Sequence, residues 1–228
     1  MKAEHRPTAG HEHEFEAAPG LPELLPAGEH LLWQGSPSWQ VLARRAFHLR
    51  KLMVYFAIIL GLRGAFVLSD GGSAVDALRS MAWLLPLAAI ALGILAALAY
   101  LSARSTLYTI TNKRVVMRIG IVLTLTFNLP FKRIASAGLL LDADGCGDIP
   151  LVLAGSDRIA WLNLWPHARP WRIKQPEPML RCVPQAAEVA RTLANAWSAA
   201  TGLNAAPTPS AVSAVPTGAA VQPVFATH

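Results

Sequence analysis

The feature that constrains this chain most is an apolar run over residues 81–101, MAWLLPLAAIALGILAALAYL. It is 21 residues long and contains no charged side chain. As a helix it covers roughly 30 Å at ~1.5 Å per residue, which matches the hydrocarbon thickness of a bilayer. Pro86 lies near its start, where a membrane helix tolerates proline. The run predicts a transmembrane helix, so the rest of the chain has to fold next to a membrane.

A second apolar run, residues 52–68, is 17 residues long, which is at the lower limit for crossing a bilayer. It contains Arg63, five residues from its end. An arginine within a membrane can mark a functional site. From this position, however, we expect its long side chain to reach the membrane surface or to contact the facing helix. Together the two runs predict a transmembrane hairpin over residues 52–101.

The distribution of Lys and Arg predicts how this hairpin is oriented. Four precede the first run (Arg44, Arg45, Arg50 and Lys51), Arg79 lies between the runs, and four follow soon after the second (Arg104, Lys113, Arg114 and Arg118). Because cytoplasmic loops carry the excess of positive residues, both termini are expected in the cytoplasm and the short loop outside. The net charge of +6 then fits attraction of these residues to an anionic cytoplasmic leaflet, and no nucleic-acid partner is expected.

The stretch after the second run has the pattern of β-structure. β-Branched and aromatic residues fill residues 106–119 around a turn at Asn112–Lys113, and residues 121–128 alternate with a period of two. Two further strands are predicted at residues 149–154 and 158–164. A helix from Pro184, ended by Gly202, places one apolar face against the strands. We therefore expect a cytoplasmic, mainly β domain over residues 102–200 with a C-terminal capping helix.

The remaining segments are less regular. Residues 1–20 and 201–228 are expected to be disordered tails, which includes the His11–Glu14 segment that superficially resembles a metal motif. Residues 21–51 form a pre-membrane segment, with an interfacial helix predicted over residues 41–51. Within it, the apolar patch Leu31–Trp33 lies either along the membrane surface or against the β domain.

No motif supports an enzyme, so catalytic residues, bound metals and cofactors are all predicted to be absent. The acidic stretch Asp142–Asp148 is predicted to be a hairpin turn, because Cys146 and the lack of a following glutamate do not fit a calcium loop. Cys146 and Cys182 are expected to be inert thiols in a reduced compartment. His30, His48 and His167 are expected at the surface, with ligation of a pigment metal as the alternative for an imidazole.

The segment Trp165–Pro184 contains five prolines, which predict an irregular loop over most of its length. Tryptophan and arginine are favoured at binding hot spots and at lipid headgroups. The candidate partner-binding residues are therefore those of its first half: Trp165, His167, Arg169, Trp171 and Arg172. The alternative is a loop that merely packs over one end of the sheet.

Two stretches resemble a known family. Tyr108–Val116 with Gly120, and Gly28–Gly35 upstream, resemble the bacterial pleckstrin-homology-like (PH-like) domain of small membrane proteins. Leu107–Phe131, Trp165–Arg172, Glu177–Pro178 and Leu180–Cys182 are more narrowly similar to the photosynthetic complex assembly proteins of purple bacteria, the PuhB family. The resemblance covers about residues 21–197.

The resemblance implies a PH-like β sandwich or barrel of about seven strands with a C-terminal capping helix, anchored in the bacterial inner (intracytoplasmic) membrane. It also implies a non-enzymatic factor that helps to assemble the photosynthetic reaction centre and core light-harvesting complex. Reaction-centre subunits are then the expected partners, with light-harvesting 1 polypeptides, inner-membrane lipids and a second copy of the chain as further candidates. Two other functions stay open: a bacteriochlorophyll or lipid carrier, and an unrecognised membrane enzyme.

Overall fold

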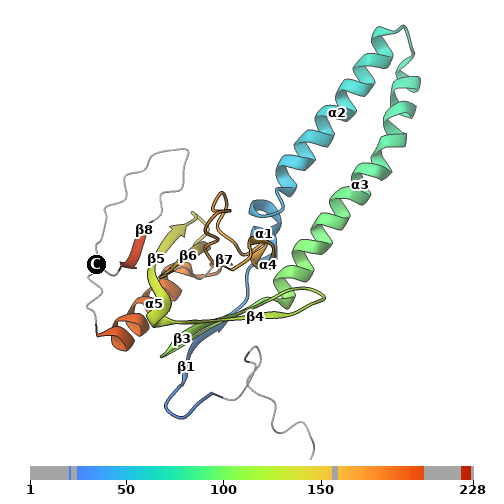
Figure 1. The fold of residues 1–228 in the computed structure, drawn as a ribbon. Helices are drawn as coiled ribbons and strands as arrows, with labels where there is room; N and C mark the ends of the chain where they lie inside the picture. Colours follow the sequence, from blue (N-terminus) through green and yellow to red (C-terminus); the bar gives the residue numbers. More distant parts are fainter. Residues whose placement is uncertain (1–20, 22–24, 156–158, 203–221, 227–228) are drawn as a thin grey trace, which may run out of the picture.

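The computed structural model describes residues 21, 25–155, 159–202 and 222–226. The elements in order are β1 (Leu31–Gly35), α1 (Trp39–Arg45), α2 (Leu49–Ser69), α3 (Ala74–Ser105), β2 (Leu107–Thr111), β3 (Arg114–Ile119), β4 (Leu125–Pro130), the 3-10 turn η1 (Phe131–Arg133), β5 (Ile134–Leu141), β6 (Gly147–Leu153), α4 (Trp161–Leu164), β7 (Met179–Val183), α5 (Ala186–Thr201) and β8 (Gln222–Ala226). A long helical hairpin projects from a two-sheet β domain (Figure 1).

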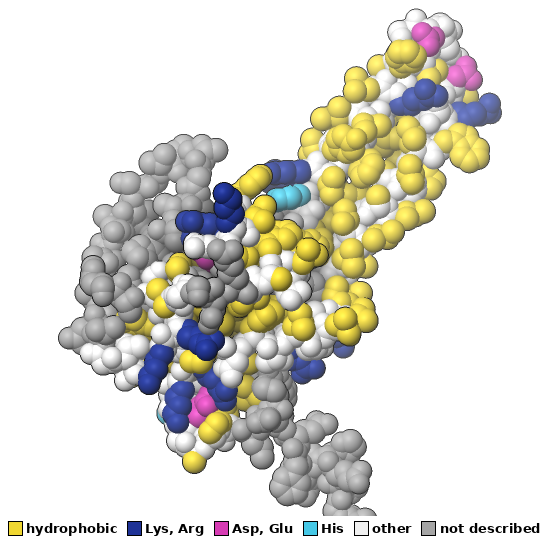
Figure 2. All heavy atoms as spheres, viewed as in Figure 1, with side chains coloured by type: hydrophobic (Ala, Val, Ile, Leu, Met, Phe, Trp, Pro, Cys, Tyr) yellow, Lys and Arg dark blue, Asp and Glu magenta, His cyan; other side chains and the backbone are white. Residues whose placement is uncertain are grey.

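The hairpin consists of α2 and α3, both long and apolar enough to cross a membrane. Most of its large apolar side chains are exposed, for example Leu62 at 64% and Phe66 at 61%. So much exposed apolar surface on two helices of this length fits a membrane environment. Figure 2 shows apolar side chains along the hairpin, with Lys and Arg near its tip and at its base. The structure thus agrees with the predicted membrane anchor, although α2 and α3 extend beyond the predicted runs.

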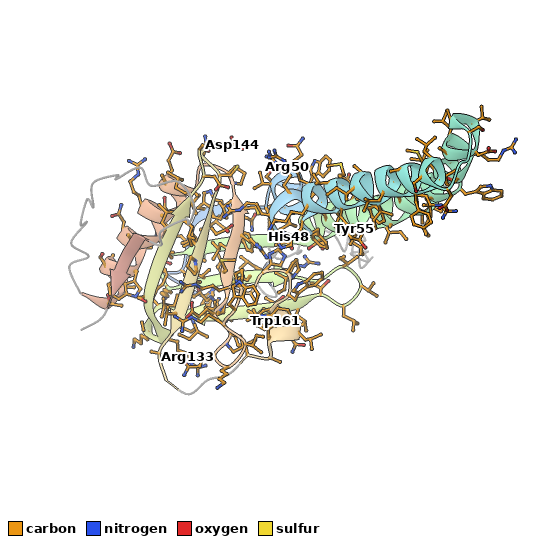
Figure 3. All side chains as sticks on the ribbon, turned by 90° about the horizontal axis from the view of Figure 1, so that it is seen from above. His48, Arg50, Tyr55, Arg133, Asp144 and Trp161 are labelled. Atoms are coloured by element: carbon orange, nitrogen blue, oxygen red, sulfur yellow. The ribbon has the colours of Figure 1, made fainter. Side chains whose placement is uncertain are left out.

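The β domain is a sandwich of two antiparallel sheets, with strand orders β1-β2-β3-β4 and β7-β6-β5-β8. Inward-facing residues of both sheets form one core, in which Tyr108, Ile110 and Leu151 are fully buried. The amphipathic helix α5 closes this core on the side away from the hairpin (Figures 1 and 3). Its Trp197 is 1% exposed and donates a hydrogen bond from Nε1 to the carbonyl oxygen of Ile134 over 3.3 Å. The predicted sandwich with a C-terminal capping helix is confirmed.

The membrane hairpin is an insertion between two neighbouring strands of the sandwich. β1 precedes the hairpin and β2 follows it, yet the two strands pair antiparallel, with Gly35 opposite Tyr108 and a register shift between Leu31 and Trp33. The pairing places Leu31–Trp33 in the sheet, which decides between the two alternatives for this patch. It also extends the β domain upstream of the expected boundary at residue 102. Because β1 and β2 share one sheet, the chain must enter and leave the membrane on the same side.

Three local predictions are wrong. The strand expected from residue 121 begins only at Leu125, because residues 120–124 turn around Gly120 (φ 117°) and leave Val122 90% exposed. The strand expected over residues 158–164 is also absent from its described part, where Trp161–Leu164 form the short helix α4. The i, i+3 spacing of Trp161 and Leu164 places both side chains against the core. Residue 158 lies outside the described part. The interfacial helix predicted over residues 41–51 is divided at His48, which has φ 52°.

The predicted tails need one further correction. Residues 1–20 lie outside the described part of the chain, as do residues 203–221 and 227–228. Within the predicted C-terminal tail, however, Thr201 completes α5 and residues 222–226 form β8. β8 pairs antiparallel with β5, so main-chain hydrogen bonding to a free sheet edge gives this segment an order that its composition does not indicate.

Candidate functional site at the base of the membrane helices

The 165–178 loop, which joins α4 to β7, contains all five candidate partner-binding residues. It is more regular than its prolines predicted, because Ala168 and Pro178 form an antiparallel bridge. The amide of Arg169 donates to the carbonyl oxygen of Glu177 over 3.0 Å, which closes the loop above this bridge. Its two ends are therefore fixed to the sandwich, while residues 170–175 at its tip are exposed.

A buried carboxylate organises the charges of the loop. Glu177 is 8% exposed, and its Oε2 lies 2.7 Å from Nη1 of Arg169. Its Oε1 lies 3.5 Å from Nε of Arg172, whose side chain is 55% exposed. With Lys174 included, the loop carries three cations against one anion. The exposed tip is therefore positively charged and suits an acidic partner.

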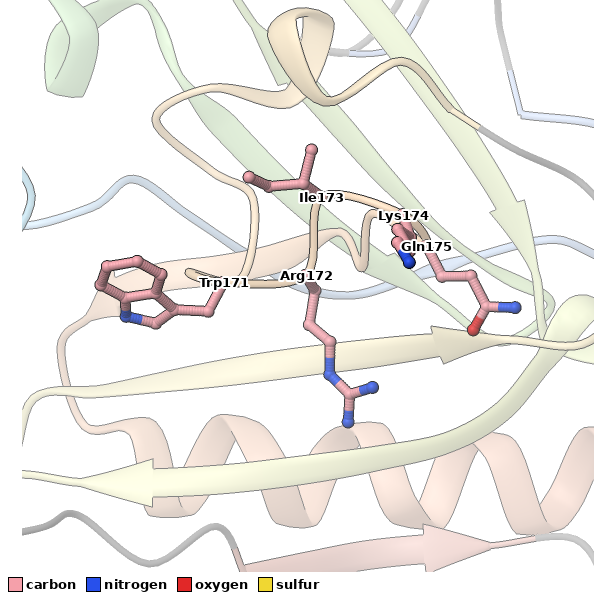
Figure 4. Close-up of a pocket in the computed structure, with 5 residues that line it drawn as sticks. All are labelled: Trp171, Arg172, Ile173, Lys174 and Gln175. Atoms are coloured by element: carbon pink, nitrogen blue, oxygen red, sulfur yellow. The ribbon is translucent and has the colours of Figure 1, made fainter.

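Trp171 is the most exposed aromatic side chain of the loop. It is 95% exposed and has a backbone φ of 66°. A bulky residue at positive φ is strained, and such strain is characteristic of functional loops. Trp171 and Arg172 project in different directions from the start of an open hollow of about 760 Å³ lined by residues 171–175 (Figure 4). The tip thus presents an indole and a guanidinium as separate contacts.

Trp165 and His167, at the other end of the loop, have different environments. Trp165 is 48% exposed and packs edge-on against Phe47, with ring centroids 5.4 Å apart. His167 is fully buried. The expectation of a surface histidine is wrong at this position, and His167 has no surface with which to touch a partner. The reason is that the loop folds back over the end of β2, a contact between residues far apart in sequence.

The hydrogen bonds of His167 define its tautomer. The Thr106 hydroxyl donates its hydrogen to the carbonyl oxygen of Ser102 over 2.7 Å, so it can only accept from Nε2 of His167, which is 3.0 Å away. Nδ1 is then unprotonated and accepts from the Tyr108 hydroxyl over 2.6 Å. The Tyr108 oxygen in turn accepts from the backbone N–H of Arg181 over 3.1 Å. The network connects the end of the membrane helix α3 to strands β2 and β7.

Both titratable rings of this network are held neutral. Burial and, to a smaller extent, the nearby Arg181 guanidinium lower the pKa of His167 to about 3. Burial also raises the pKa of Tyr108 well above its ordinary range. The network is therefore suited to fixing the loop in place rather than to proton transfer at neutral pH.

The hairpin is attached to the β domain through α1. Leu42 is fully buried in a small apolar core that also includes Ala99 and Ala103 of α3 and Cys182 of β7. Arg45 lies 2.6 Å from a carboxylate oxygen of Asp142 and 3.3 Å from one of Asp148. Asp142 begins the turn between β5 and β6, and Asp148 is the second residue of β6, so the predicted hairpin turn is confirmed and both carboxylates have a structural role.

The neighbouring cysteine is part of the same attachment. The Cys182 amide donates to Oδ1 of Asp148 over 2.7 Å, and its carbonyl oxygen accepts from the Ser38 amide over 2.9 Å. Burial and the nearby carboxylate of Asp148 raise the pKa of the Cys182 thiol to about 12. The thiol is therefore protonated at neutral pH, as an inert cysteine requires.

The structure thus separates the five candidate residues into three groups. Trp171 and Arg172 lie at the exposed tip, with Arg169 beside it and paired with Glu177. Trp165 lies at the junction with the membrane helices, and His167 is internal. Sequence reasoning missed Glu177, although an acid between Pro176 and Pro178 near three cations signals an ion pair. Among the described residues, no group of three or more His, Cys, Asp or Glu side chains is placed to hold a metal ion.

Comparison with known proteins identifies the family. The bacterial PH domain family matches residues 55–197, which is more than half of the chain. This chain belongs to the bacterial PH domain family. The matched region begins within α2 and ends at Trp197 of α5. β1 and α1, which pack against the PH domain, therefore precede the matched region.

A relative in Rhodobacter capsulatus is similar over most of the chain. It is described as an uncharacterized 23.7 kDa protein in the puhA 5′ region, and it is 40% identical over 190 residues. The alignment covers 83% of this chain and 89% of the relative, so the similarity includes the membrane hairpin as well as the PH domain. No solved structure matches the chain.

Proposed function

We propose that this protein is a non-enzymatic, membrane-anchored factor of the PuhB type, which assists assembly of the photosynthetic reaction centre and core light-harvesting complex by binding their subunits. The observation that carries the proposal is the extensive similarity to a protein from the puhA 5′ region, because puhA is a photosynthesis gene. The segments that resemble PuhB proteins, Leu107–Phe131 and Trp165–Arg172, lie in the β domain and in its exposed loop.

The geometry suggests how such a factor works. The α1 attachment and the His167 network hold the loop close to the membrane helices, so its exposed tip stays near the membrane surface. A membrane subunit that diffuses in the same bilayer then meets Trp171 and Arg172 at a high effective concentration. The indole supplies a rigid apolar contact, and the guanidinium supplies a charged one. Reaction-centre subunits, light-harvesting 1 polypeptides and a second copy of the chain are the candidate partners.

The proposed location is the cytoplasmic side of the bacterial inner (intracytoplasmic) membrane. It is supported by the Lys and Arg counts on the two sides of the hairpin. The pairing of β1 with β2 supports it further, because the residues before and after the hairpin then share one side.

Site-specific crosslinking tests the proposal in photosynthetic membranes. A photo-reactive phenylalanine analogue replaces Trp171 in the full chain, and the captured chains are identified by mass spectrometry. The same analogue at Arg191, exposed on α5, is the matched control. Capture of a reaction-centre or light-harvesting subunit from position 171 but not from 191 is expected. Equal capture from both positions, or undiminished reaction-centre assembly in a Trp171→Ala, Arg172→Ala double variant, contradicts the role of the loop.

The alternative of a bacteriochlorophyll carrier is less well supported. Both ring nitrogens of His167 are occupied by Thr106 and Tyr108, so this imidazole has no free atom for a pigment metal. His48 remains exposed beside the membrane helix. Pigment absorbance that copurifies stoichiometrically with the full chain and is lost in His48→Gln would favour carriage over assembly.

A further inference from the structure

A pocket of about 530 Å³ lies where the connection between α1 and α2 meets the second sheet and the 165–178 loop. Its volume is typical of small-ligand sites. Its described lining is unusually basic: Arg45, His48, Arg169 and Arg181 face a single acid, Asp148. The remaining lining is mostly apolar and includes Trp171 at the rim.

One arginine of this pocket forms no ion pair within the described part of the chain. Arg45 is paired with Asp142 and Asp148, and Arg169 with Glu177. Arg181 has no carboxylate partner among the described residues. Its Nη1 donates to the carbonyl oxygen of Pro166 over 2.7 Å, whereas its Nε is buried without an acceptor. A buried charged donor without an acceptor is destabilising, so Arg181 favours an anion in this pocket.

A second observation places the pocket at the membrane surface. His48 lines the pocket and immediately precedes α2, the first membrane helix. The first turn of α2 carries Arg50 and Lys51 and no acid. Because the N-terminus of a helix is the positive end of its dipole, two cations there repel it unless an anion is close. Figure 3 shows His48 and Arg50 at the base of the hairpin, where the chain passes from the β domain into α2.

We propose that this pocket binds the phosphate of an anionic phospholipid, of the phosphatidylglycerol class, from the leaflet that α2 enters. Arg181 provides a planar guanidinium for the phosphate oxygens, and Arg50 and Lys51 add positive charge at headgroup level. The exposed indole of Trp171 lies at the rim, the position that tryptophan favours at a membrane interface. A lipid is favoured over a soluble phosphate compound because the pocket lies directly before α2, a helix long and apolar enough to cross a membrane. This site goes beyond partner binding and does not depend on it.

Native mass spectrometry of the full chain in mild detergent tests the proposal. Retention of phosphatidylglycerol is compared with retention of zwitterionic phosphatidylcholine, with and without excess inorganic phosphate. For the wild type we expect selectivity for phosphatidylglycerol of about tenfold or more, because both lipids offer the same phosphate but the choline of phosphatidylcholine adds a cation beside the pocket arginines, and like charges repel. Equal retention of the two lipids overturns the site. Displacement of the lipid by inorganic phosphate identifies a general phosphate site and overturns the lipid assignment.

Substitutions then test whether Arg181 is responsible for the selectivity between the two lipids. Arg181→Gln removes the unpaired charge, and Arg191→Gln makes the same change on the exposed face of α5, far from the pocket. We expect the first variant to lose the selectivity and the second to keep it; unchanged selectivity in a folded Arg181→Gln overturns the proposal. If Arg181→Gln does not fold, Trp171→Glu decides, because it places a negative charge at the rim of the pocket without disturbing packing. Selectivity that survives Trp171→Glu also overturns the proposal.

Discussion

The buried imidazole of His167 makes the stability of the β domain depend on pH in a predictable direction. Its pKa of about 3 in the folded protein lies below the ordinary value of 6.5. Between these values the unfolded chain binds a proton that the folded chain does not bind. The stabilisation is therefore complete above the ordinary pKa and is lost progressively as the pH falls toward the folded one.

The size of the effect follows from the same two pKa values. Each unit of difference corresponds to about 1.4 kcal/mol, so roughly 2 kcal/mol of the free energy of unfolding is lost between about pH 8 and about pH 5. His167→Gln removes the titrating group, while the amide can still donate to Thr106 and accept from Tyr108. The difference in stability between wild type and variant should therefore shrink by that amount over this range.

The measurement is denaturant unfolding of the full chain in detergent micelles, followed by tryptophan fluorescence at several pH values. Carboxylates titrate equally in wild type and His167→Gln. The difference between their free energies of unfolding therefore contains only the contribution of the histidine. Parallel stability curves for wild type and His167→Gln down to about pH 5 would refute the reasoning. Nitrogen NMR of the ring gives an independent check, since a proton on Nδ1 instead of Nε2 contradicts the assigned tautomer.

Three further outcomes follow from the junction between hairpin and sandwich. Asp148→Asn leaves Arg45 partly unpaired and should lower the free energy of unfolding by roughly 2 to 4 kcal/mol. Asp144→Asn changes an acid whose side chain is 65% exposed, so it should alter the free energy of unfolding by less than about 1 kcal/mol. Thermal unfolding of the two variants in detergent measures this difference. In the native protein Cys146 should react with a maleimide well before the buried Cys182, whose thiol reacts only after unfolding; equal labelling rates contradict the raised pKa. In oriented membrane vesicles, a cysteine replacing Asp70 at the hairpin tip should react from the side opposite to Cys146, and labelling of both from one side contradicts the membrane topology.

The anchor and the general fold were predictable because their signals are local. An uncharged apolar run indicates a membrane helix by itself, and alternating β-branched residues indicate strands without knowledge of their partners. The capping helix α5 was predictable for the same reason, since its buried face repeats at helical spacing. Gly120 shows the limit of such reasoning: the alternation continues through residues 121–124, but the chain turns there and leaves the strand.

The features that define the candidate site depend on contacts across the sequence. Arg45 meets Asp142 across 97 positions, and His167 meets Tyr108 across 59. Periodicity cannot reveal such pairs, because each residue alone has the pattern of an ordinary surface group. Composition likewise grouped Trp171 and His167 as contact candidates, because it cannot distinguish an exposed tryptophan from a histidine that is buried four residues earlier.

The insertion of the hairpin between β1 and β2 has a consequence for biogenesis. During synthesis β1 emerges first, and its partner strand is made only after both helices. The sheet can close only when the two helices have returned the chain to its starting side. A molecule with only one helix inserted has β1 and β2 on opposite faces of the bilayer and cannot form the sandwich. A folded β domain therefore indicates that both helices of the hairpin have been inserted.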